Sequence, residues 1–229
     1  MNLKLEAARR ALDFVRDGMC LGLGSGSTSA CFVDLLGERW QKGDLPHIRG
    51  VPTSQSTAER ARQWGIPLTT LSEIDSLDLA VDGADEVDPA LNLIKGLGRA
   101  LLREKIIEIH TRQLIVIVDE SKLVQRLGSR GPLPVEIVRF EAHSHVRWLN
   151  SLGCRAEQWF DDGEPVVTDN DNFLALCHFE DVGGIPDVIH LARKLEARPG
   201  IVEHGLFLGM AKLVIVAGEK GVRILEQPS

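Results

Sequence analysis

The stretch Met19-Cys-Leu-Gly-Leu-Gly-Ser-Gly-Ser-Thr28 indicates the fold class of this 229-residue chain. Its apolar first half, residues 19–23, is typical of a strand that is buried on both faces of a sheet. Its second half is rich in glycine and in hydroxyl side chains, and a helix is expected to begin near Ser29. A buried strand that passes through such a loop into a helix is the repeating unit of a parallel α/β sheet.

The same alternation continues on both sides of this stretch. Apolar runs predict strands at residues 47–51, 77–81, 114–118 and 212–217, and a last strand at 222–225. Amphipathic spacing predicts helices at residues 4–15, 56–64 and 100–110. Continuous apolar strands separated by helices predict a parallel sheet that helices cover on both faces.

The middle of the chain is organised differently. Gly131-Pro-Leu-Pro134 interrupts the alternation and predicts a boundary. After it the pattern predicts strands at residues 135–140, 154–160 and 172–179, helices at 141–152 and 186–197, and a short strand near Ile201. This βαββαβ order is the split βαβ arrangement of a small α+β domain. We therefore expect a parallel α/β domain whose chain leaves near Gly131 and returns near His204.

The composition narrows the classes of function. A net charge of -7 argues against sequence-independent binding to nucleic acid or to an anionic membrane. Positive charge for an anionic ligand must then be local, from a helix terminus or a few lysines. No stretch approaches the ~20 apolar residues of a membrane span, and residues 1–16 carry charge in every turn, unlike a signal peptide. The scattered cysteines are interpreted as reduced thiols of a cytoplasmic protein.

The glycine-rich loop is the first candidate site. In Gly24-Ser-Gly-Ser-Thr28, backbone N–H groups can approach an anion, and Ser25, Ser27 and Thr28 add hydroxyl donors. The loop favours the phosphate of a small molecule over a dinucleotide, because its spacing is not G-x-G-x-x-G and no acidic residue ends the next strand. A tight turn with a hydroxyl helix cap is the alternative.

An acidic segment, Asp82-Gly-Ala-Asp-Glu86, directly follows the strand predicted at residues 77–81. Open α/β sheets bind ligands in the loops at the carboxyl ends of their strands. Asp82 and Asp85 are three residues apart, so they could bind sugar hydroxyls or share a proton. No histidine accompanies them, which disfavours a divalent metal, and a solvated turn is the alternative.

The segment Lys95-Gly-Leu-Gly-Arg99 opens a predicted helix that carries Glu104. Ala100 and Ile107 are the neighbours of Glu104 at i−4 and i+3, so its side chain need not lie in bulk water. A partly buried carboxylate at this place would suit general-base catalysis. The alternative is an exposed glutamate that pairs with a neighbour such as Lys105.

Lys122 follows the strand predicted at residues 114–118 and would project from the same sheet edge as the other three segments. His143 and His145 are two residues apart and point to different faces of a helix, which is poor geometry for a shared metal. We therefore predict no metal site.

Together and in this order, these segments resemble ribose-5-phosphate isomerase of type A. The likeness rests on the glycine-rich loop, residues 78–88, residues 95–106 and Val118-Asp-Glu-Ser-Lys122. It continues through residues 132–136, 165–170 and 205–209, and so covers almost the whole chain. Asp-Gly-Ala-Asp-Glu and Leu-Leu-Arg-Glu-Lys are highly specific together, although each is weak alone.

The resemblance implies a Rossmann-like parallel-sheet domain of residues 1–130 plus 205–229, with an inserted smaller α+β (split βαβ) lid domain of residues 131–204. It implies interconversion of D-ribose 5-phosphate and D-ribulose 5-phosphate through an enediolate, in the non-oxidative pentose phosphate pathway. It further implies a cytoplasmic homodimer or homotetramer that needs no metal or other cofactor and binds neither nucleic acid nor membrane.

The resemblance also implies roles for single residues. Glu104 would be the general base, Lys95 would stabilise the enediolate oxygen, and Asp82 would help the sugar ring to open. Lys4 would contribute to phosphate binding. The residues implied to bind substrate are Ser25, Gly26, Ser27, Thr28, Asp82, Gly83, Ala84, Asp85, Lys95, Gly96, Leu97, Gly98 and Lys122.

Leu97 and Arg99 depart from the family pattern, since glycine is common at both positions. Their side chains could narrow the approach of the substrate, so a non-catalytic sugar-phosphate sensor is an alternative hypothesis. A nucleotide-dependent enzyme is a third hypothesis, and it requires binding of NAD(P) or CoA.

Overall fold

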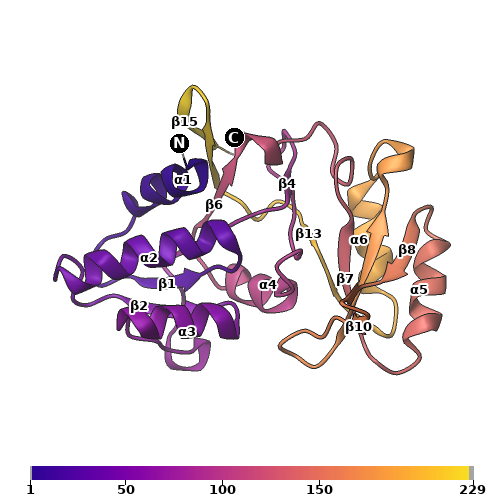
Figure 1. Ribbon diagram of the computed structural model, residues 1–229, viewed down its shortest axis with the longest axis horizontal. Helices are drawn as coiled ribbons and strands as arrows, with labels where there is room; N and C mark the ends of the chain where they lie inside the picture. The colour runs from indigo at the N-terminus through magenta and orange to yellow at the C-terminus, as the bar shows by residue number, and fades with distance from the viewer. Residues whose placement is uncertain (1, 227–229) are drawn as a thin grey trace. The chain divides into compact units, whose positions relative to one another are not determined.

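The computed structural model describes residues 2–226, which divide into two compact units (Figure 1). The first unit holds residues 2–84, Arg103–Lys122 and 209–226. The second unit holds Asp85–Leu102 and Leu123–Leu208. The predicted lid, residues 131–204, falls within the second unit, which also takes in residues that the sequence placed in the parallel-sheet domain. The lid therefore stays a prediction.

The first unit is built on a six-stranded sheet in the order β15-β14-β6-β3-β1-β2. Neighbouring strands are parallel from β14 to β2, as predicted, and the edge strand β15 forms an antiparallel hairpin with β14. The strands are β1 (Cys20–Leu23), β2 (Arg49–Pro52), β3 (Leu79–Asp82), β6 (Leu114–Asp119), β14 (Leu213–Gly218) and β15 (Gly221–Glu226).

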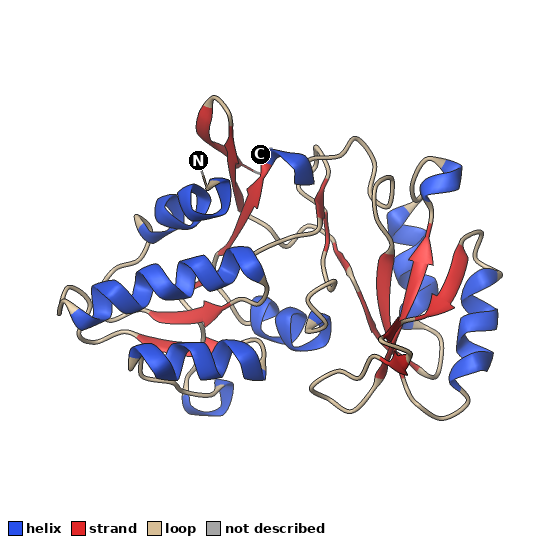
Figure 2. Cartoon of the chain, in the orientation of Figure 1, coloured by secondary structure: helices blue, strands red, loops and turns tan. Residues whose placement is uncertain are grey.

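Helices cover both faces of this sheet (Figure 2). On one face α1 (Leu3–Leu12), α2 (Ser27–Gln41) and α3 (Gln55–Trp64) share a core with alternate strand residues such as Leu21 and Ile115. On the other face Ile107, from α4 (Leu101–Ile109), packs in a cluster with Cys20, Val51 and Leu77. A Cβ on Gly22 would lie 3.1 Å from Ile107 Cγ2, so glycine at this position permits the close approach of α4.

The second unit contains a four-stranded antiparallel sheet in the order β12-β7-β11-β8. Its chain order confirms the predicted βαββαβ pattern: β7 (Leu133–Ile137), α5 (Ala142–Asn150), β8 (Arg155–Gln158), β11 (Phe173–His178), α6 (Val188–Glu196) and β12 (Ile201–His204). Both helices pack on one face, because Leu149 of α5 and Leu195 of α6 share a cluster with Val135 and Ala175.

Several short elements were not predicted. A three-stranded sheet, in the order β13-β5-β4, joins β4 (Glu86–Val87), β5 (Leu93–Ile94) and β13 (Leu206–Phe207). A small hairpin joins β9 (Phe160–Asp161) to β10 (Glu164–Pro165), and three 3₁₀ turns are η1 (Leu71–Glu73), η2 (Glu120–Lys122) and η3 (Glu180–Val182). The strand predicted at residues 135–140 begins earlier, at Leu133, and therefore includes Pro134. Pro134 takes part through its carbonyl oxygen, which accepts from the Gly205 N–H at 2.8 Å.

The helices of residues 2–226 include none that is long and apolar enough to cross a membrane.

Candidate active site

Three of the four predicted segments meet at one edge of the first unit's sheet. Strands β6, β3 and β1 are parallel neighbours, so the loops that follow them leave from the same edge. These loops carry residues 24–28, residues 82–84 and η2, which ends at Lys122. The prediction that these segments share an edge is confirmed within this unit.

The glycine-rich loop ends at the amino terminus of α2. Gly26 is the N-cap at a φ of 89°, and it offers no side chain to the first N–H groups of this 15-residue helix. The ammonium of Lys4 donates to Ser27 Oγ at 2.8 Å. A helix amino terminus with a lysine beside it is an arrangement that attracts a phosphate.

Asp82 is almost completely buried, with 1% of its surface exposed. Its Oδ1 accepts from the Ser25 N–H at 3.0 Å, the Ser29 hydroxyl at 2.8 Å and the Gly83 N–H at 2.7 Å. The solvated turn that was the alternative is therefore excluded. Sequence reasoning missed Ser29, although its place one turn into the helix that follows the loop was a usable signal.

Ser25 is buried as well, and its hydroxyl does not face the space in front of the loop. It lies 2.7 Å from Thr53 Oγ1 and donates to Ser54 Oγ at 2.8 Å. Sequence reasoning also missed Thr53, Ser54 and Thr57. Their signal was their position, since Thr53 and Ser54 directly follow β2, the parallel neighbour of β1, and Thr57 lies in the first turn of the helix that comes next.

Glu104 lies on α4 with 3% of its surface exposed. Ala100 and Ile107, the neighbours expected from the sequence, are buried as well, at 4% and 5% exposed. The alternative of a surface glutamate is excluded. The solvent-facing side of α4 is instead marked by Ile106 and Ile109, which are 41% and 64% exposed.

In the second unit, the hairpin of β4 and β5 brings Asp85 and Lys95 to the end of one strand pair. The Asp85 N–H donates to the Ile94 carbonyl at 2.7 Å, and the Lys95 N–H donates to the Gly205 carbonyl at 2.9 Å. Lys95 is 2% exposed, with Nζ 5.3 Å from the centre of the Phe207 ring. Lysine is rarely buried to this extent unless it is paired.

Side chains of the second unit also hold the segment Lys95–Arg99. Asp85 Oδ2 accepts from the Leu97 N–H at 2.9 Å. The Leu97 side chain is about one-third exposed, and Gly98 is exposed. The Arg99 guanidinium lies 5.1 Å from the Trp159 ring and 2.5 Å from an Asp161 carboxylate oxygen. Arg99 is therefore held by side chains of the second unit.

Glu86, the last residue of the acidic segment, has a structural role that the sequence did not suggest. It is 3% exposed and accepts three backbone N–H groups of one loop: from Gly128 at 2.5 Å, Arg130 at 2.8 Å and Gly131 at 3.0 Å. Its carboxylate thus fixes the chain just before β7.

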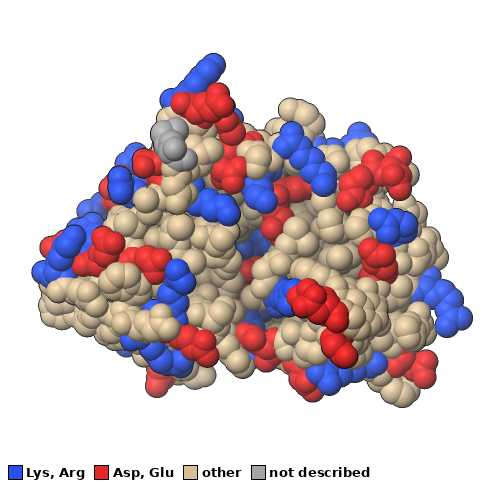
Figure 3. All heavy atoms as spheres, in the orientation of Figure 1, with Lys and Arg blue, Asp and Glu red and all other residues tan. Residues whose placement is uncertain are grey.

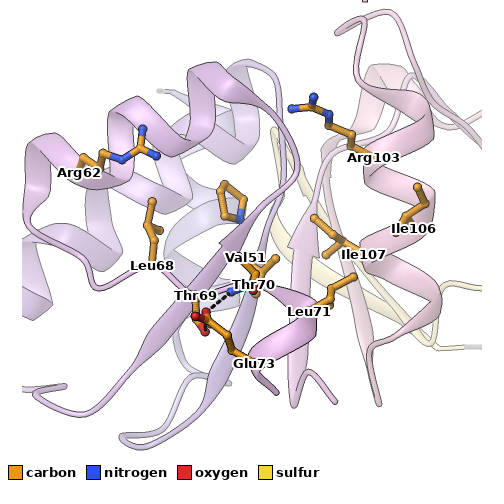
Figure 4. Close-up of a pocket in the computed structure, with 11 residues that line it drawn as sticks. Val51, Arg62, Leu68, Thr69, Thr70, Leu71, Glu73, Arg103, Ile106 and Ile107 are labelled. Atoms are coloured by element: carbon orange, nitrogen blue, oxygen red, sulfur yellow. Dashed lines mark hydrogen bonds between the residues drawn. The ribbon is translucent and has the colours of Figure 1, made fainter. Parts of the chain in front are cut away.

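A separate pocket of about 440 Å³ lies in the first unit (Figure 4). Leu68, Leu71 and Ile107 contribute to its apolar lining, and Arg62 and Arg103 extend toward its mouth from α3 and α4. None of the predicted site residues lines it, so it is distinct from the candidate active site.

Charges of both signs are mixed over the face shown in Figure 3, consistent with local and not global attraction of an anion. Within residues 2–226, no group of three His, Cys, Asp or Glu side chains is arranged to hold a metal ion.

Comparisons with known proteins agree with one another. A family model described as Ribose 5-phosphate isomerase A (phosphoriboisomerase A) matches residues 49–221. Ribose-5-phosphate isomerase A of Roseiflexus castenholzii is 51% identical over 224 residues, or 97% of this chain and 94% of the relative. That of Nitrobacter hamburgensis is 48% identical over 98% of this chain and 97% of the relative.

Solved structures give the same result. Ribose 5-phosphate isomerase from Plasmodium falciparum is 35% identical, with a TM-score of 0.95 over 99% of each chain. A D-ribose-5-phosphate isomerase in complex with phospho-erythronic acid is 42% identical, with a TM-score of 0.94 over 99% of this chain and 100% of that one.

Proposed function

Because the chain belongs to the ribose 5-phosphate isomerase A family and interconverts ribose 5-phosphate and ribulose 5-phosphate, we propose that Glu104 moves the proton between C2 and C1 of the sugar. The observation that carries this assignment is the burial of Glu104 on α4, where it is 3% exposed. A carboxylate with few competing waters can collect a proton and return it within one turnover.

The proposed step conserves atoms and electrons. Glu104 takes the proton from C2 of the open-chain aldose, and the C2–H electron pair forms the C1–C2 double bond while the C1 carbonyl pair moves to O1. The proton returns to C1, the O2 hydroxyl proton passes to O1, and C2 becomes the carbonyl carbon. Asp82 is proposed to assist ring opening before this step.

Lys95 is proposed to stabilise the enediolate oxygen. Its side chain is buried, with the ammonium beside the Phe207 ring, and a buried positive charge interacts with a developing negative charge more strongly than one in water. Asp85, Gly96, Leu97 and Gly98 are proposed to bind the sugar from the adjoining backbone. No metal is proposed, and activity in EDTA tests this point.

The phosphate is proposed to bind at residues 25–28, at the amino terminus of α2. Gly26 provides no side-chain cap there, and Lys4 lies 2.8 Å from Ser27 Oγ. Lys122, from η2 at the same sheet edge, is proposed as a further contact. Binding of this remote group supplies the energy that holds the reacting carbons in place.

The test is Glu104→Gln, with formation of ribulose 5-phosphate followed in a coupled assay. We expect kcat to fall at least about a hundred-fold, the scale of general-base catalysis. Binding of phospho-erythronic acid, the ligand of the similar solved enzyme, should be retained. Glu108→Gln is the matched control, because Glu108 is 4% exposed on the same helix. A Glu104→Gln enzyme with wild-type turnover removes Glu104 from this role.

We also propose that the chain forms a homo-oligomer in the cytoplasm. Exposed apolar side chains on α4, Ile106 and Ile109, support self-association, and the four free cysteines suit a reducing compartment. Sedimentation equilibrium of the purified chain tests the first statement, and fractionation of cells tests the second.

A further inference from the structure

A chain of buried hydroxyl groups lies directly behind the glycine-rich loop. It consists of Ser25 in the loop, Ser54 at the N-cap of α3 and Thr57 in the first turn of α3; we refer to these residues as the hydroxyl chain. Their exposed fractions are 8%, 8% and 6%, and all three belong to the first unit.

The hydrogen bonds of the hydroxyl chain start and end on the loop. Ser25 Oγ donates to Ser54 Oγ at 2.8 Å, Ser54 Oγ donates to Thr57 Oγ1 at 3.0 Å, and Thr57 Oγ1 donates to the Gly24 carbonyl at 3.0 Å. Thr53 Oγ1 lies 2.7 Å from the Ser25 hydroxyl and adds a second contact. The hydroxyl chain thus holds the loop at two points, the Gly24 carbonyl and the Ser25 side chain.

The anchor of these bonds is a regular helix. Ser54 also accepts from the Thr57 N–H at 3.1 Å and so caps α3. Hydrogen bonds between buried hydroxyls strengthen one another in a medium of low dielectric constant, and an orphaned member is costly. The loop after β1 therefore takes its position from the start of α3.

We propose that Thr57 and Ser54 are positioning residues for phosphate binding, acting through Ser25 and the Gly24 carbonyl. This inference rests on the proposed function, in which residues 25–28 hold the phosphate. In this proposal the Ser25 hydroxyl holds the loop in its conformation and does not bind the phosphate. The groups that remain for the phosphate are the N–H groups at the start of α2, the hydroxyls of Ser27 and Thr28, and Lys4.

The test compares Thr57→Val with Thr57→Ser. Valine keeps the shape of threonine but removes the hydroxyl that contacts Ser54, the Gly24 carbonyl and, at 3.3 Å, the Ser25 hydroxyl, whereas serine keeps the hydroxyl. Thr111→Val is the matched control, because it removes a hydroxyl bond to a backbone carbonyl, that of Gln113 at 3.1 Å, elsewhere in the first unit. Thr53→Val is the second variant, since it removes a different partner of the Ser25 hydroxyl.

Two quantities are measured on each variant: KM for ribose 5-phosphate, and the inhibition constant of inorganic phosphate. Thr57→Val should raise both by about five-fold, the equivalent of one hydrogen bond. Its kcat should stay within roughly two-fold of the wild-type value, because the phosphate is bound equally in the substrate complex and in the transition state. Thr53→Val should shift both constants in the same direction, while Thr57→Ser and Thr111→Val should match wild type.

Unchanged constants in folded Thr57→Val and Thr53→Val would overturn the inference, as would a fall in kcat without any change in phosphate affinity. Stabilisation of the protein by inorganic phosphate, measured as a shift in Tm, provides a readout that does not require turnover. If the wild-type chain failed to isomerise ribose 5-phosphate, the proposed function would fail. The loss of the phosphate-induced Tm shift in Thr57→Val would then still test the positioning role.

Discussion

The Ser25 N–H donates a hydrogen bond to Oδ1 of Asp82 at 3.0 Å, joining the loop after β1 to the last residue of β3. These strands are parallel neighbours, so the bond links two loops of the same sheet edge. A Cβ on Gly24 would lie 2.1 Å from this oxygen, which explains why glycine is needed there. Asp82 therefore has two functions: it holds the loop, and it is proposed to act on the sugar ring.

Asp82→Asn should impair both functions. The amide keeps one acceptor oxygen but loses the charge that strengthens three hydrogen bonds, so the free energy of unfolding should fall by about 1–3 kcal/mol. Turnover should fall by at least about ten-fold, since general acid–base groups contribute 10²–10⁴-fold. Urea denaturation and the coupled assay measure the two effects.

Asp78→Asn is the control for this prediction. Asp78 also accepts a backbone N–H from β1, that of Cys20 at 2.9 Å, but it precedes β3 and lies at the opposite edge of the sheet. The Asp78→Asn variant should be less stable than wild type but should keep the wild-type kcat. Equal losses of turnover in both variants would show that Asp82 acts through stability alone.

Glu86→Ala should loosen the chain before β7. The substitution leaves the N–H groups of Gly128, Arg130 and Gly131 without their acceptor, and the buried Gly128 N–H is the costliest of these. We expect a loss of about 2–3 kcal/mol, the cost of a buried unsatisfied group together with weaker losses at the partly exposed ones. Amide hydrogen exchange at these three residues should accelerate.

Glu157→Gln is the matched control in the second unit, because Glu157 is exposed and pairs with Arg155 and His178 at the surface. Its effect on stability should stay within about 0.5 kcal/mol. Wild-type rates of amide hydrogen exchange at Gly128, Arg130 and Gly131 in Glu86→Ala would show that the Glu86 carboxylate does not fix this loop.

The order of the long elements could be predicted from the sequence because a buried parallel strand leaves a continuous apolar run, as in β6 and β14. Two-residue strands leave no such pattern. Consequently β4, β5 and β13 were missed, although they carry the backbone that positions Asp85 and Lys95. The start of β7 was placed too late for a related reason, since sequence alone does not show that Pro134 can take part in the sheet through its carbonyl oxygen.

The candidate site could be predicted where a reactive side chain directly follows a recognisable parallel strand, as Asp82 does. It was not predictable where burial decides the role. Glu86 and Glu104 are both glutamates in charged stretches, yet both are buried, and Glu86 binds backbone N–H groups. The hydroxyl chain was hidden as well, because Ser54 and Thr57 acquire their role only when β2 lies beside β1.

Glu73 gives a prediction for pH dependence. Hydrogen bonds from the Thr69 hydroxyl and the Thr70 N–H hold the pKa of Glu73 below its ordinary value of 4.5. A carboxyl group whose folded pKa is lowered stabilises the fold above its unfolded pKa, and this stability is lost as pH falls through the folded pKa. The difference in stability between wild type and Glu73→Gln should therefore be largest near neutral pH and shrink below about pH 4.5.

Urea denaturation at several pH values measures this difference. Glu59→Gln is the control, since Glu59 is an exposed glutamate on α3 of the same unit. A Glu73→Gln protein whose stability relative to wild type does not vary with pH would contradict the role given to the Thr69 and Thr70 contacts.

Arg99 occupies a position where the resemblance led us to expect glycine, and its own φ is 68°, in the left-handed region that favours glycine. Arg99→Gly relieves strain of about 1–2 kcal/mol. It loses a cation–π contact worth about 0.5–1 kcal/mol and an exposed ion pair worth about 0–1 kcal/mol. Arg99→Ala loses the same contacts and keeps the strain. The glycine variant should therefore be more stable than the alanine variant by about 1 kcal/mol.

Arg139 provides the matched comparison, because its guanidinium lies 5.2 Å from the Phe173 ring and pairs with Asp171, but its own φ is not positive. At Arg139 the order should reverse, since glycine adds only flexibility to an ordinary backbone. Thermal unfolding of the four variants measures both differences. The same order at both positions would show that the left-handed backbone does not determine the preference for glycine at position 99.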